Sequence, residues 1–372
     1  MNTIRTLGLG LILSSSALAP SFALAWGSDG HAIVGALADR LIKGSHAQTE
    51  VNALLLPGET LALAANWLDC AKGTFCGPPT PEMIAYTLAN PKHRQYHYTD
   101  IPFQRAHYRD GMVGAGADDI VHTLKQAIQV LQNRDQNQEM KGAAPNPHHF
   151  TPRQALMLVA HLVGDIHQPL HVGAAYVDRN GKYVMPSARS DVDGMTLFDT
   201  RGGNNFLLDE ASLALSSARL IPDKAGPSGG AVPVSVGGRP ARRSFHAYWD
   251  INAVDYAMRR AHAATPAQFA DGTIASLPAL PQGYPGHRGA AGSDPAHWPA
   301  LWADDGLEVA KLAYAGVRPG RHGAQVGRNG EVIDVWLLTL PPDYPLTSAA
   351  LARRQLAKAG YRLAALLQAI WP

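Results

Sequence analysis

Apolar residues recur every three or four positions along much of the chain, a spacing typical of helices that bury one face. Ile33, Leu37 and Leu41 form such a series near the N-terminus, directly after Ser28 and Asp29. Serine and aspartate side chains accept hydrogen bonds from the free N–H groups of a first helical turn, so either residue can cap this helix. The sequence therefore predicts a helix that begins at Ser28 or Asp29 and extends through Leu41.

Similar patterns predict further helices in the middle and at the end of the chain. One begins at Thr151-Pro152, a capping threonine followed by proline at the first helical position, and Pro169 is expected to end it. Its apolar residues are Leu156, Val159, Leu162, Val163 and Ile166. Another is expected from His246 past Met258, and the last from Ser348 to Gln368.

Two kinds of segment interrupt the helical pattern. Tyr176 to Phe198 contains Y-V-D-R-N-G-K-Y-V, which predicts a β-hairpin that turns at Asn180-Gly181. Residues Ile221 to Arg243 and Leu277 to Ser293 are rich in glycine and proline, which predicts loops. The expected fold class is all-α, a single mainly helical domain over residues 26–372 with a small β-hairpin insertion.

The first 25 residues have the composition of a signal peptide. Arg5 supplies a positive charge, Leu7 to Leu13 begins an apolar stretch, and Ala23-Leu24-Ala25 fits the small-x-small cleavage rule. The apolar stretch is short for a membrane span, and no later segment is long enough for one. We expect cleavage between Ala25 and Trp26, and an exported protein, periplasmic or secreted, that has no membrane anchor.

Charge and cysteine content narrow the functional classes. Removal of Arg5 with the signal peptide lowers the net charge from +2 to about +1, which argues against a basic surface that wraps duplex DNA. Cys70 and Cys76 enclose five residues. In an exported protein this arrangement favours a small disulfide loop over free thiols, which stay the alternative, and the spacing does not match a Cys-x-x-Cys zinc site.

Histidine and aspartate recur at a spacing that suits metal binding. His161 and Asp165 are four residues apart, which stacks them on one helix face, and His171 follows just beyond Pro169. The same spacing recurs at His246 and Asp250. Imidazole nitrogen and carboxylate oxygen are the ligands of catalytic zinc, and two such pairs with a third histidine indicate more than one metal ion.

Further motifs extend this pattern in a specific order. Trp26, His31, Asp69 and His97 precede the two pairs, which gives the order W-x4-H, W-x-D, H-Y-x-D, H-x3-D-x5-H, G-G-N and H-x2-W-D. This order resembles the zinc-dependent single-strand-specific nucleases, a family that includes fungal extracellular nucleases and plant bifunctional nucleases. W-A-D-D-G-L and A-K-A-G-Y-R-L-A continue the resemblance towards the C-terminus.

The resemblance implies three zinc ions. The implied ligands of the first are Asp69, His97, His161 and Asp165, and those of the second are His171, His246 and Asp250. The third would be bound by the amino group and carbonyl oxygen of Trp26, by His31, and by Asp165 as a bridge. Taken alone, His31 could be a packed histidine, Asp69 a helix cap and Asp250 an arginine partner, but the complete ordered set favours a metal cluster.

The resemblance also implies an activity: hydrolysis of single-stranded DNA and RNA to 5′-phosphorylated products, with removal of 3′-phosphate from nucleotides as a further activity. Zinc ions lower the pKa of bound water towards ~7 and neutralise the phosphate. Lys72, where the family commonly has arginine, would stabilise transition-state charge. Asp100, otherwise an ordinary turn residue, would orient the attacking water or read a base edge, and Tyr98 would stack on a base unless it packs in the core. The turn that would adjoin this base pocket is Gly202, Gly203 and Asn204.

The hairpin of Tyr176–Phe198 is longer than the link that this family usually has between His171 and Gly202. Because the hairpin begins just after His171, its tip at Asn180-Gly181 is expected to overhang the substrate cleft.

Two alternatives stay open from the sequence. A zinc phospholipase C has a related helical fold, but its first histidine lies further from the N-terminal tryptophan and its last ligand is usually glutamate, where this chain has Asp250. A non-enzymatic zinc protein would not need the open coordination positions that this ligand set implies. Single-stranded nucleic acid and nucleotides are the expected substrates, and no obligate protein partner is evident.

Overall fold

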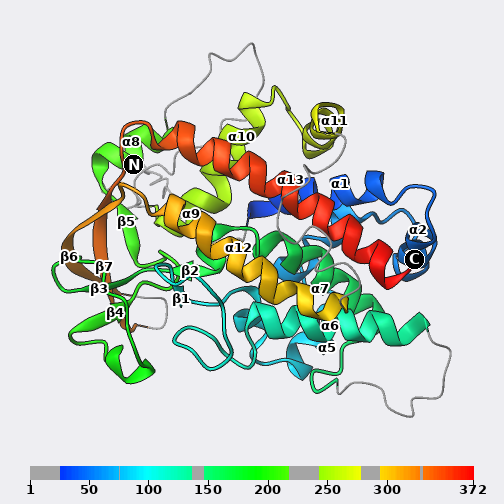
Figure 1. Ribbon diagram of the computed structural model, residues 1–372, viewed down its shortest axis with the longest axis horizontal. Coiled ribbons are helices and arrows are strands. Elements are labelled where there is room, and N and C mark those ends of the chain that lie inside the picture. Colours follow the sequence, from blue (N-terminus) through cyan, green and yellow to red (C-terminus); the bar gives the residue numbers. More distant parts are fainter. Residues whose placement is uncertain (1–25, 75, 136–145, 218–242, 278–293, 327–329) are drawn as a thin grey trace, which may run out of the picture.

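The computed structural model describes residues 26–74, 76–135, 146–217, 243–277, 294–326 and 330–372. Helices make up most of these residues, and the strands gather at one end of the molecule (Figure 1). The predicted signal peptide, and nearly all of the two segments rich in glycine and proline, lie outside the described residues. The expectation of a mainly helical domain with a small β insertion is confirmed.

The longer helices, among them α6, α12 and α13, run in similar directions across the molecule, and shorter elements connect them (Figure 1). The N-terminal half contains α1 (Gly27–Leu41), α2 (His46–Leu54), α3 (Leu61–Ala64), α4 (Trp67–Cys70), α5 (Pro81–Ala89), η1 (His93–His97), α6 (Ile120–Asp135), α7 (Pro152–Asp165) and η2 (Pro169–His171). The C-terminal half contains η3 (Arg189–Asp191), α8 (Glu210–Ser217), α9 (Phe245–Ala247), η4 (Tyr248–Ala253), α10 (Val254–Arg260), α11 (Pro266–Ser276), η5 (Pro295–His297), α12 (Trp298–Ala313) and α13 (Tyr344–Ile370). Among the described residues, no helix has the length and apolar character that crossing a membrane requires.

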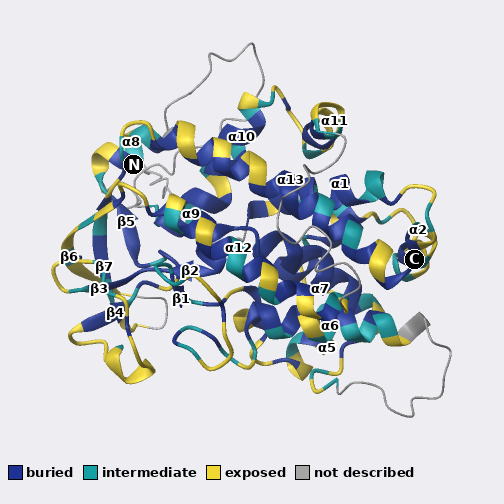
Figure 2. Cartoon of the chain, viewed as in Figure 1, coloured by how far each residue is buried: buried dark blue, intermediate teal, exposed yellow. Residues whose placement is uncertain are grey.

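Helix α7 is the central element of the core. Its residues from Gln154 to Asp165 are all buried, as Figure 2 shows for the middle of the molecule. A helix that is apolar around its whole circumference is stable only when other elements cover every side. Thr151 caps it as predicted, in a capping box with Gln154. The helix ends at Asp165, four residues before the proline expected to end it.

Helix α1 begins earlier than predicted, and the expected cap is wrong. The residue before its first turn is Trp26, in a left-handed conformation with φ 41°, and neither Ser28 nor Asp29 caps the helix. The first helical hydrogen bond runs from the N–H of Gly30 to the carbonyl oxygen of Trp26 at 3.1 Å, and a tertiary contact holds Trp26 in place. The Trp26 indole N–H donates to the carbonyl of Gly164 on α7 at 2.7 Å.

The two remaining helix predictions are confirmed with altered boundaries. The chain is helical from Phe245 to Arg260, through α9, η4 and α10, and η4 has π-helical geometry. A π turn inserts an extra residue into a helix and is frequent at functional sites. Helix α13 begins at Tyr344, four residues before the predicted start, and extends to Ile370.

The strands form small sheets. β1 (Ile101–Pro102) pairs in parallel with β2 (Gly173–Ala174), and β3 (Tyr176–Asp178) pairs antiparallel with β4 (Leu197–Asp199). A third sheet has the order β5 (Phe206–Leu208), β7 (Val332–Thr339) and β6 (Arg318–Val326), with β5 parallel and β6 antiparallel to β7. The sequence pattern did not reveal this third sheet.

The predicted hairpin is present in part. A turn at Asn180-Gly181 brings Val177 opposite Tyr183 in a single bridge, and Gly181 has φ +79°. The longer pairing of β3, however, is with β4 rather than with the strand after the turn. A Cβ atom on Gly181 would lie 2.9 Å from the carbonyl oxygen of Pro319, so the tip packs against β6.

A buried cluster of charged and polar groups joins three segments that the motif order had singled out. Asp305 on α12 accepts hydrogen bonds from Lys358 at 2.7 Å and from Arg362 at 2.9 Å, both on α13. Arg362 also lies 2.8 Å from Nε2 of His167, two residues after α7 ends. These contacts explain why W-A-D-D-G-L and A-K-A-G-Y-R-L-A accompany the histidine motif: the segments meet in the core.

The cluster predicts a large effect of a single substitution. Asp305→Asn removes the negative charge between two cations, one of which, Arg362, has a fully buried side chain. Because an uncompensated buried charge is costly, the free energy of unfolding should fall by about 3 kcal/mol. Urea unfolding followed by circular dichroism measures it.

Asp304 is the matched control on the same helix. Its carboxylate pairs with His107, whose side chain is 64% exposed, and exposed pairs contribute about 0–1 kcal/mol. It also accepts the N–H of Tyr108 at 2.7 Å, a bond that the amide oxygen of asparagine can keep. Equal losses of stability for Asp304→Asn and Asp305→Asn would contradict the structural role of the buried cluster.

Candidate functional site

Histidine and aspartate side chains from distant segments converge in the core. Three groups have ligand atoms within 4.8 Å of one another, and every member is buried. The groups are His31, Asp69 and His161; His97, His161 and Asp165; and His171, His246 and Asp250. All eight side chains that the sequence nominated as metal ligands are therefore in these clusters, while Trp26, nominated through its backbone, lies at the start of α1.

Asp165, at the end of α7, lies at the junction of the first two groups. Its Oδ1 is 3.2 Å from Nε2 of His31, and its Oδ2 is 2.9 Å from Nδ1 of His97 and 3.1 Å from Nε2 of His161. Asp69 on α4 completes the group, with Oδ1 3.7 Å from Nε2 of His161. The two oxygens of Asp165 thus face different histidines, which is the arrangement that a bridging carboxylate requires.

The third group has a feature that favours a cation. His171 Nδ1 lies 2.7 Å from the carbonyl oxygen of His97, and His246 Nδ1 lies 2.8 Å from that of Gly202. A carbonyl only accepts, so both Nδ1 atoms carry the proton and, in the neutral ring, Nε2 has a lone pair. The two Nε2 atoms are 3.1 Å apart. Burial lowers the pKa of His171, and lowers that of His246 to about 3, so both rings are neutral and their lone pairs repel unless a cation lies between them.

A glutamine that the sequence analysis did not identify orients Asp250. Gln168 is fully buried; its Nε2 donates to Oδ1 of Asp250 at 2.8 Å, while its Oε1 accepts from Leu170 N–H at 2.6 Å. The second contact determines which end of the amide faces Asp250. Oδ2 of Asp250 has no hydrogen-bond partner and lies 3.6 Å from Nε2 of His246. In the sequence, the only sign of this role is the position of Gln168 between the candidate ligands Asp165 and His171.

Small residues allow the N-terminal part of the site to pack closely. A Cβ atom on Gly164 would lie 2.8 Å from Nδ1 of His31, so only glycine lets this ring reach Asp165. His31 also stacks on His161, with ring centroids 3.8 Å apart. Both ring nitrogens of His31 are buried; Nδ1 has no hydrogen-bond partner, and the one polar contact of Nε2 is Oδ1 of Asp165 at 3.2 Å. The Trp26 side chain lies against the same glycine through its indole N–H.

Lys72 lies beside the first group. Its ammonium is 2.6 Å from Oδ1 of Asp69 and its side chain is 13% exposed. Burial alone would raise the pKa of Asp69, but Lys72 and the nearby histidines outweigh it and lower this pKa to about 2. The disulfide between Cys70 and Cys76, which the sequence favoured, closes the loop that carries Lys72.

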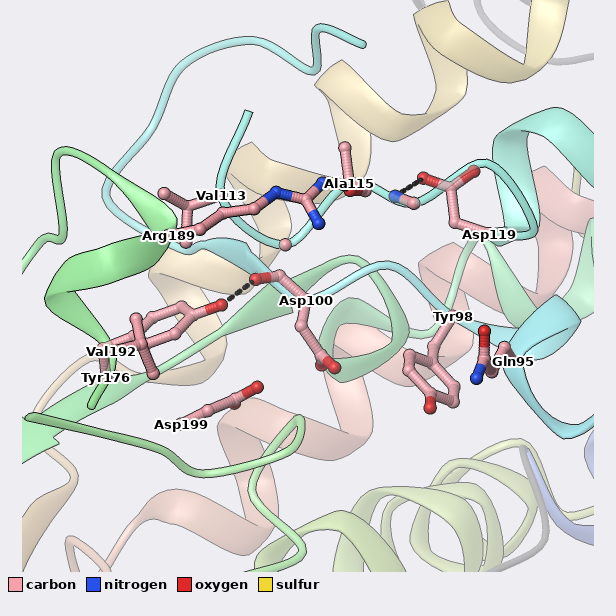
Figure 3. Close-up of a pocket in the computed structure, with 12 residues that line it drawn as sticks. Gln95, Tyr98, Asp100, Val113, Ala115, Asp119, Tyr176, Arg189, Val192 and Asp199 are labelled. Atoms are coloured by element: carbon pink, nitrogen blue, oxygen red, sulfur yellow. Dashed lines mark hydrogen bonds between the residues drawn. The ribbon is translucent and has the colours of Figure 1, made fainter. Parts of the chain in front are cut away.

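A pocket of about 350 Å³ is lined by residues on both sides of His97 in the sequence, among them Gln95 and Tyr98 (Figure 3). Its lining includes Tyr98 and Asp100, as the resemblance implied, together with side chains that the sequence analysis did not identify. These are Gln95, Val113, Asp119, Tyr176, Arg189, Val192 and Asp199. Tyr98 is 37% exposed, so packing in the core, the alternative interpretation of this residue, does not apply.

Neither the glycine turn nor the hairpin tip contributes to the lining of the pocket. Gly202, Gly203 and Asn204 are not among the residues that line the pocket. Gly202, with φ +57°, instead directs its carbonyl at His246, and a Cβ atom there would lie 2.5 Å from the carbonyl oxygen of Leu170. The pocket-lining part of the insertion is not its tip but β3, the residues around η3, and β4.

Comparison with known proteins supplies the family. A search among curated proteins finds no significant match. The family model described as S1/P1 Nuclease matches residues 26–209 and 223–372, which is nearly the whole chain after residue 25. With the histidine and aspartate clusters buried beside an open pocket, this match shows that the chain belongs to the S1/P1 nuclease family.

Proposed function

We propose that this protein is a zinc-dependent phosphodiesterase, exported after cleavage between Ala25 and Trp26, that hydrolyses single-stranded DNA and RNA to 5′-phosphorylated products. Removal of 3′-phosphate from nucleotides is proposed as a second activity. Residues 26–372 would form the mature nuclease domain. The observation that carries the proposal is the buried convergence of five histidines and three aspartates beside a pocket open to solvent.

The donor set fits three zinc ions. Zinc takes imidazole nitrogen and carboxylate oxygen, and the clusters contain only these donor types. Asp69, His97, His161 and Asp165 would hold one ion; His171, His246 and Asp250 the second; and the Trp26 backbone, His31 and Asp165 the third. The facing lone pairs of His171 and His246 support this assignment, as does the approach of His31 Nε2 to Oδ1 of Asp165.

The protein groups around the cluster would bind and orient the substrate. Bound zinc would supply water activation and neutralisation of the phosphate charge. Lys72 would add a compact positive charge, without the bidentate geometry of arginine. Tyr98 would stack on a base, a contact that contributes ~1–3 kcal/mol of binding free energy. Asp100 would accept hydrogen bonds from a base edge or orient the attacking water. The pocket would accept an unpaired base, whereas stacked duplex bases stay outside it, which is the physical reason for a single-strand preference.

A direct assay tests the function. Zinc-loaded protein should release acid-soluble nucleotides from single-stranded DNA, and it should release no headgroup from phosphatidylcholine vesicles. Release of headgroup without release of nucleotides would show that the protein is a phospholipase and not a nuclease. Zinc binding without either product would indicate a non-enzymatic protein.

The bridging role of Asp165 predicts a severe effect of Asp165→Asn. An amide retains one oxygen and loses the charge, so it cannot bridge two cations. Activity on single-stranded DNA should fall more than about 100-fold, because even loss of an outer partner of a metal ligand typically costs 10–100-fold. Zinc content, measured by mass spectrometry, should fall while the circular dichroism spectrum stays helical. Asp304→Asn is the control, and normal turnover by Asp165→Asn would remove the bridging role.

Processing of the N-terminus should control the third zinc. An amide nitrogen is a poor zinc ligand, whereas a free α-amino group has an ordinary pKa of about 7.7–8.0 and donates its lone pair when neutral. Protein that begins at Trp26 should therefore bind one zinc more than protein with a single alanine in front, and be much more active. Equal zinc content and equal specific activity of these two forms would exclude the amino-terminal ligand.

Gln168 is expected to act on zinc affinity through Asp250. Gln168→Leu removes the hydrogen bond that holds this carboxylate, so affinity at the second site should fall about 10–100-fold in a chelator competition titration. Gln154→Leu is the matched control, because it removes a buried glutamine that caps α7 and touches no candidate ligand. Unchanged zinc affinity in Gln168→Leu, with Gln154→Leu also unchanged, would contradict this role.

A further inference from the structure

The chain connects the pocket directly to two candidate metal ligands. Tyr98 directly follows His97, and the N–H of Thr99 donates to the carbonyl of His171 at 2.8 Å. The segment of Tyr98 and Asp100 is thus attached to His97, a candidate ligand of the first zinc, and to His171, a candidate ligand of the second. The volume of about 350 Å³ is within the range of small-ligand pockets.

The insertion builds the wall opposite Tyr98. Arg189 donates to the carbonyl oxygens of Met112 and Ala115, so its guanidinium ties the insertion to the loop on the far side of the pocket. Tyr176 donates to the carbonyl oxygen of Asp100 at 2.7 Å and holds the backbone of that residue. These contacts give Arg189 and Tyr176 structural roles.

Two carboxyl groups face the cavity, those of Asp100 and Asp199. Oδ1 of Asp199 also accepts the N–H of Arg201 at 2.7 Å, which leaves Oδ2 and the second lone pair of Oδ1 for a ligand. Figure 3 shows the side chains of Asp100 and Asp199 pointing toward the same space, with Tyr98 on one side. Asp199 lies at the end of β4, paired with Tyr176 on β3, so the sheet determines its position. Gln95 at the rim offers both a donor and an acceptor, so it favours no base.

The four bases differ in what they offer to such a surface. The Watson–Crick edge of guanine has adjacent N–H donors at N1 and N2, which match the two oxygens of one carboxylate. Adenine and cytosine offer one amino group beside a ring nitrogen that only accepts. Uracil and thymine offer one N–H between two carbonyl oxygens, which a carboxylate repels.

We propose that Asp199, together with Asp100, makes this pocket selective for guanine, with uracil and thymine the least favoured bases. The inference rests on the proposed nuclease function and adds to it a base preference and a residue that determines specificity. A good bidentate contact to a base edge discriminates by roughly tenfold or more.

The electrostatics of the pocket add a pH dependence. Burial raises the pKa of Asp100 and of Asp199, and the carboxylate of Asp199 raises that of Asp100 further, while Arg201 opposes both shifts. The other ionisable groups that line the pocket are Tyr98, Asp119, Tyr176 and Arg189. A carboxyl with a raised pKa is protonated at acidic pH and then accepts fewer N–H groups. The preference for guanine should therefore increase as the pH rises and weaken as it falls.

Cleavage of single-stranded oligonucleotides that differ in one base next to the scissile bond tests the proposal. The wild-type protein should cleave the guanine substrate about tenfold faster, in kcat/KM, than the uracil substrate. Asp199→Asn should bring the two rates close together while zinc content stays unchanged. Asp178→Asn is the matched control: its carboxylate accepts the N–H groups of Asn180 and Lys182 in the turn and does not line the pocket.

The outcomes separate this inference from the proposed function. Absence of cleavage of every oligonucleotide would contradict the nuclease itself. Equal rates on all four bases by an active wild-type protein would overturn only the inference, and a guanine preference that persists in Asp199→Asn would overturn the role of Asp199. If this variant fails to fold, calorimetric binding of guanosine and uridine 5′-monophosphates to the zinc-loaded wild-type protein decides: tighter binding of the guanosine nucleotide supports the preference, and equal binding overturns it.

Discussion

The structure depends on a buried carboxylate, that of Asp165. Burial raises its pKa, but His161, His171 and His31 outweigh this effect and hold the pKa well below its ordinary value. Asp165 is buried at the C-terminal end of the central helix α7, where the helix dipole disfavours negative charge. Asp250 is equally buried, and neither carboxylate has a lysine or arginine partner within the part of the chain that the structure describes. Burying a charge costs several kcal/mol unless it is paired. Histidine nitrogens at about 3 Å from Asp165 offset only part of this cost. Metal cations would neutralise the negative charge that remains in the core.

Backbone carbonyl groups fix the orientation of several histidine rings in the site. His161, His171 and His246 each direct Nδ1 at a carbonyl oxygen, of Ala65, His97 and Gly202 respectively. Such contacts select one tautomer and one ring orientation, as second-layer partners of metal sites do. Because these carbonyls lie at the end of η1 and in turns beside short helices and strands, the short elements are as important to the site as α7 itself.

The sequence predicted the elements whose signal is local. Thr151-Pro152 and the apolar run after it identified α7, and histidine–aspartate spacing identified side chains that the fold brings together. What it missed depends on tertiary context: α1 begins directly after Trp26, whose indole N–H reaches α7, and β6 contains glycines and a proline that weaken any strand pattern. Asp199 had no motif, since a lone aspartate after a strand becomes part of a pocket only when β3 and β4 pair.

The disulfide between Cys70 and Cys76 has a consequence for metal selection. Cys70 directly follows Asp69 in α4, and thiolate is a stronger ligand for soft and borderline metals than carboxylate is. Both cysteines of the chain are used in this crosslink, so no thiol is available as a ligand. The histidine and aspartate clusters therefore offer a metal nitrogen and oxygen donors only.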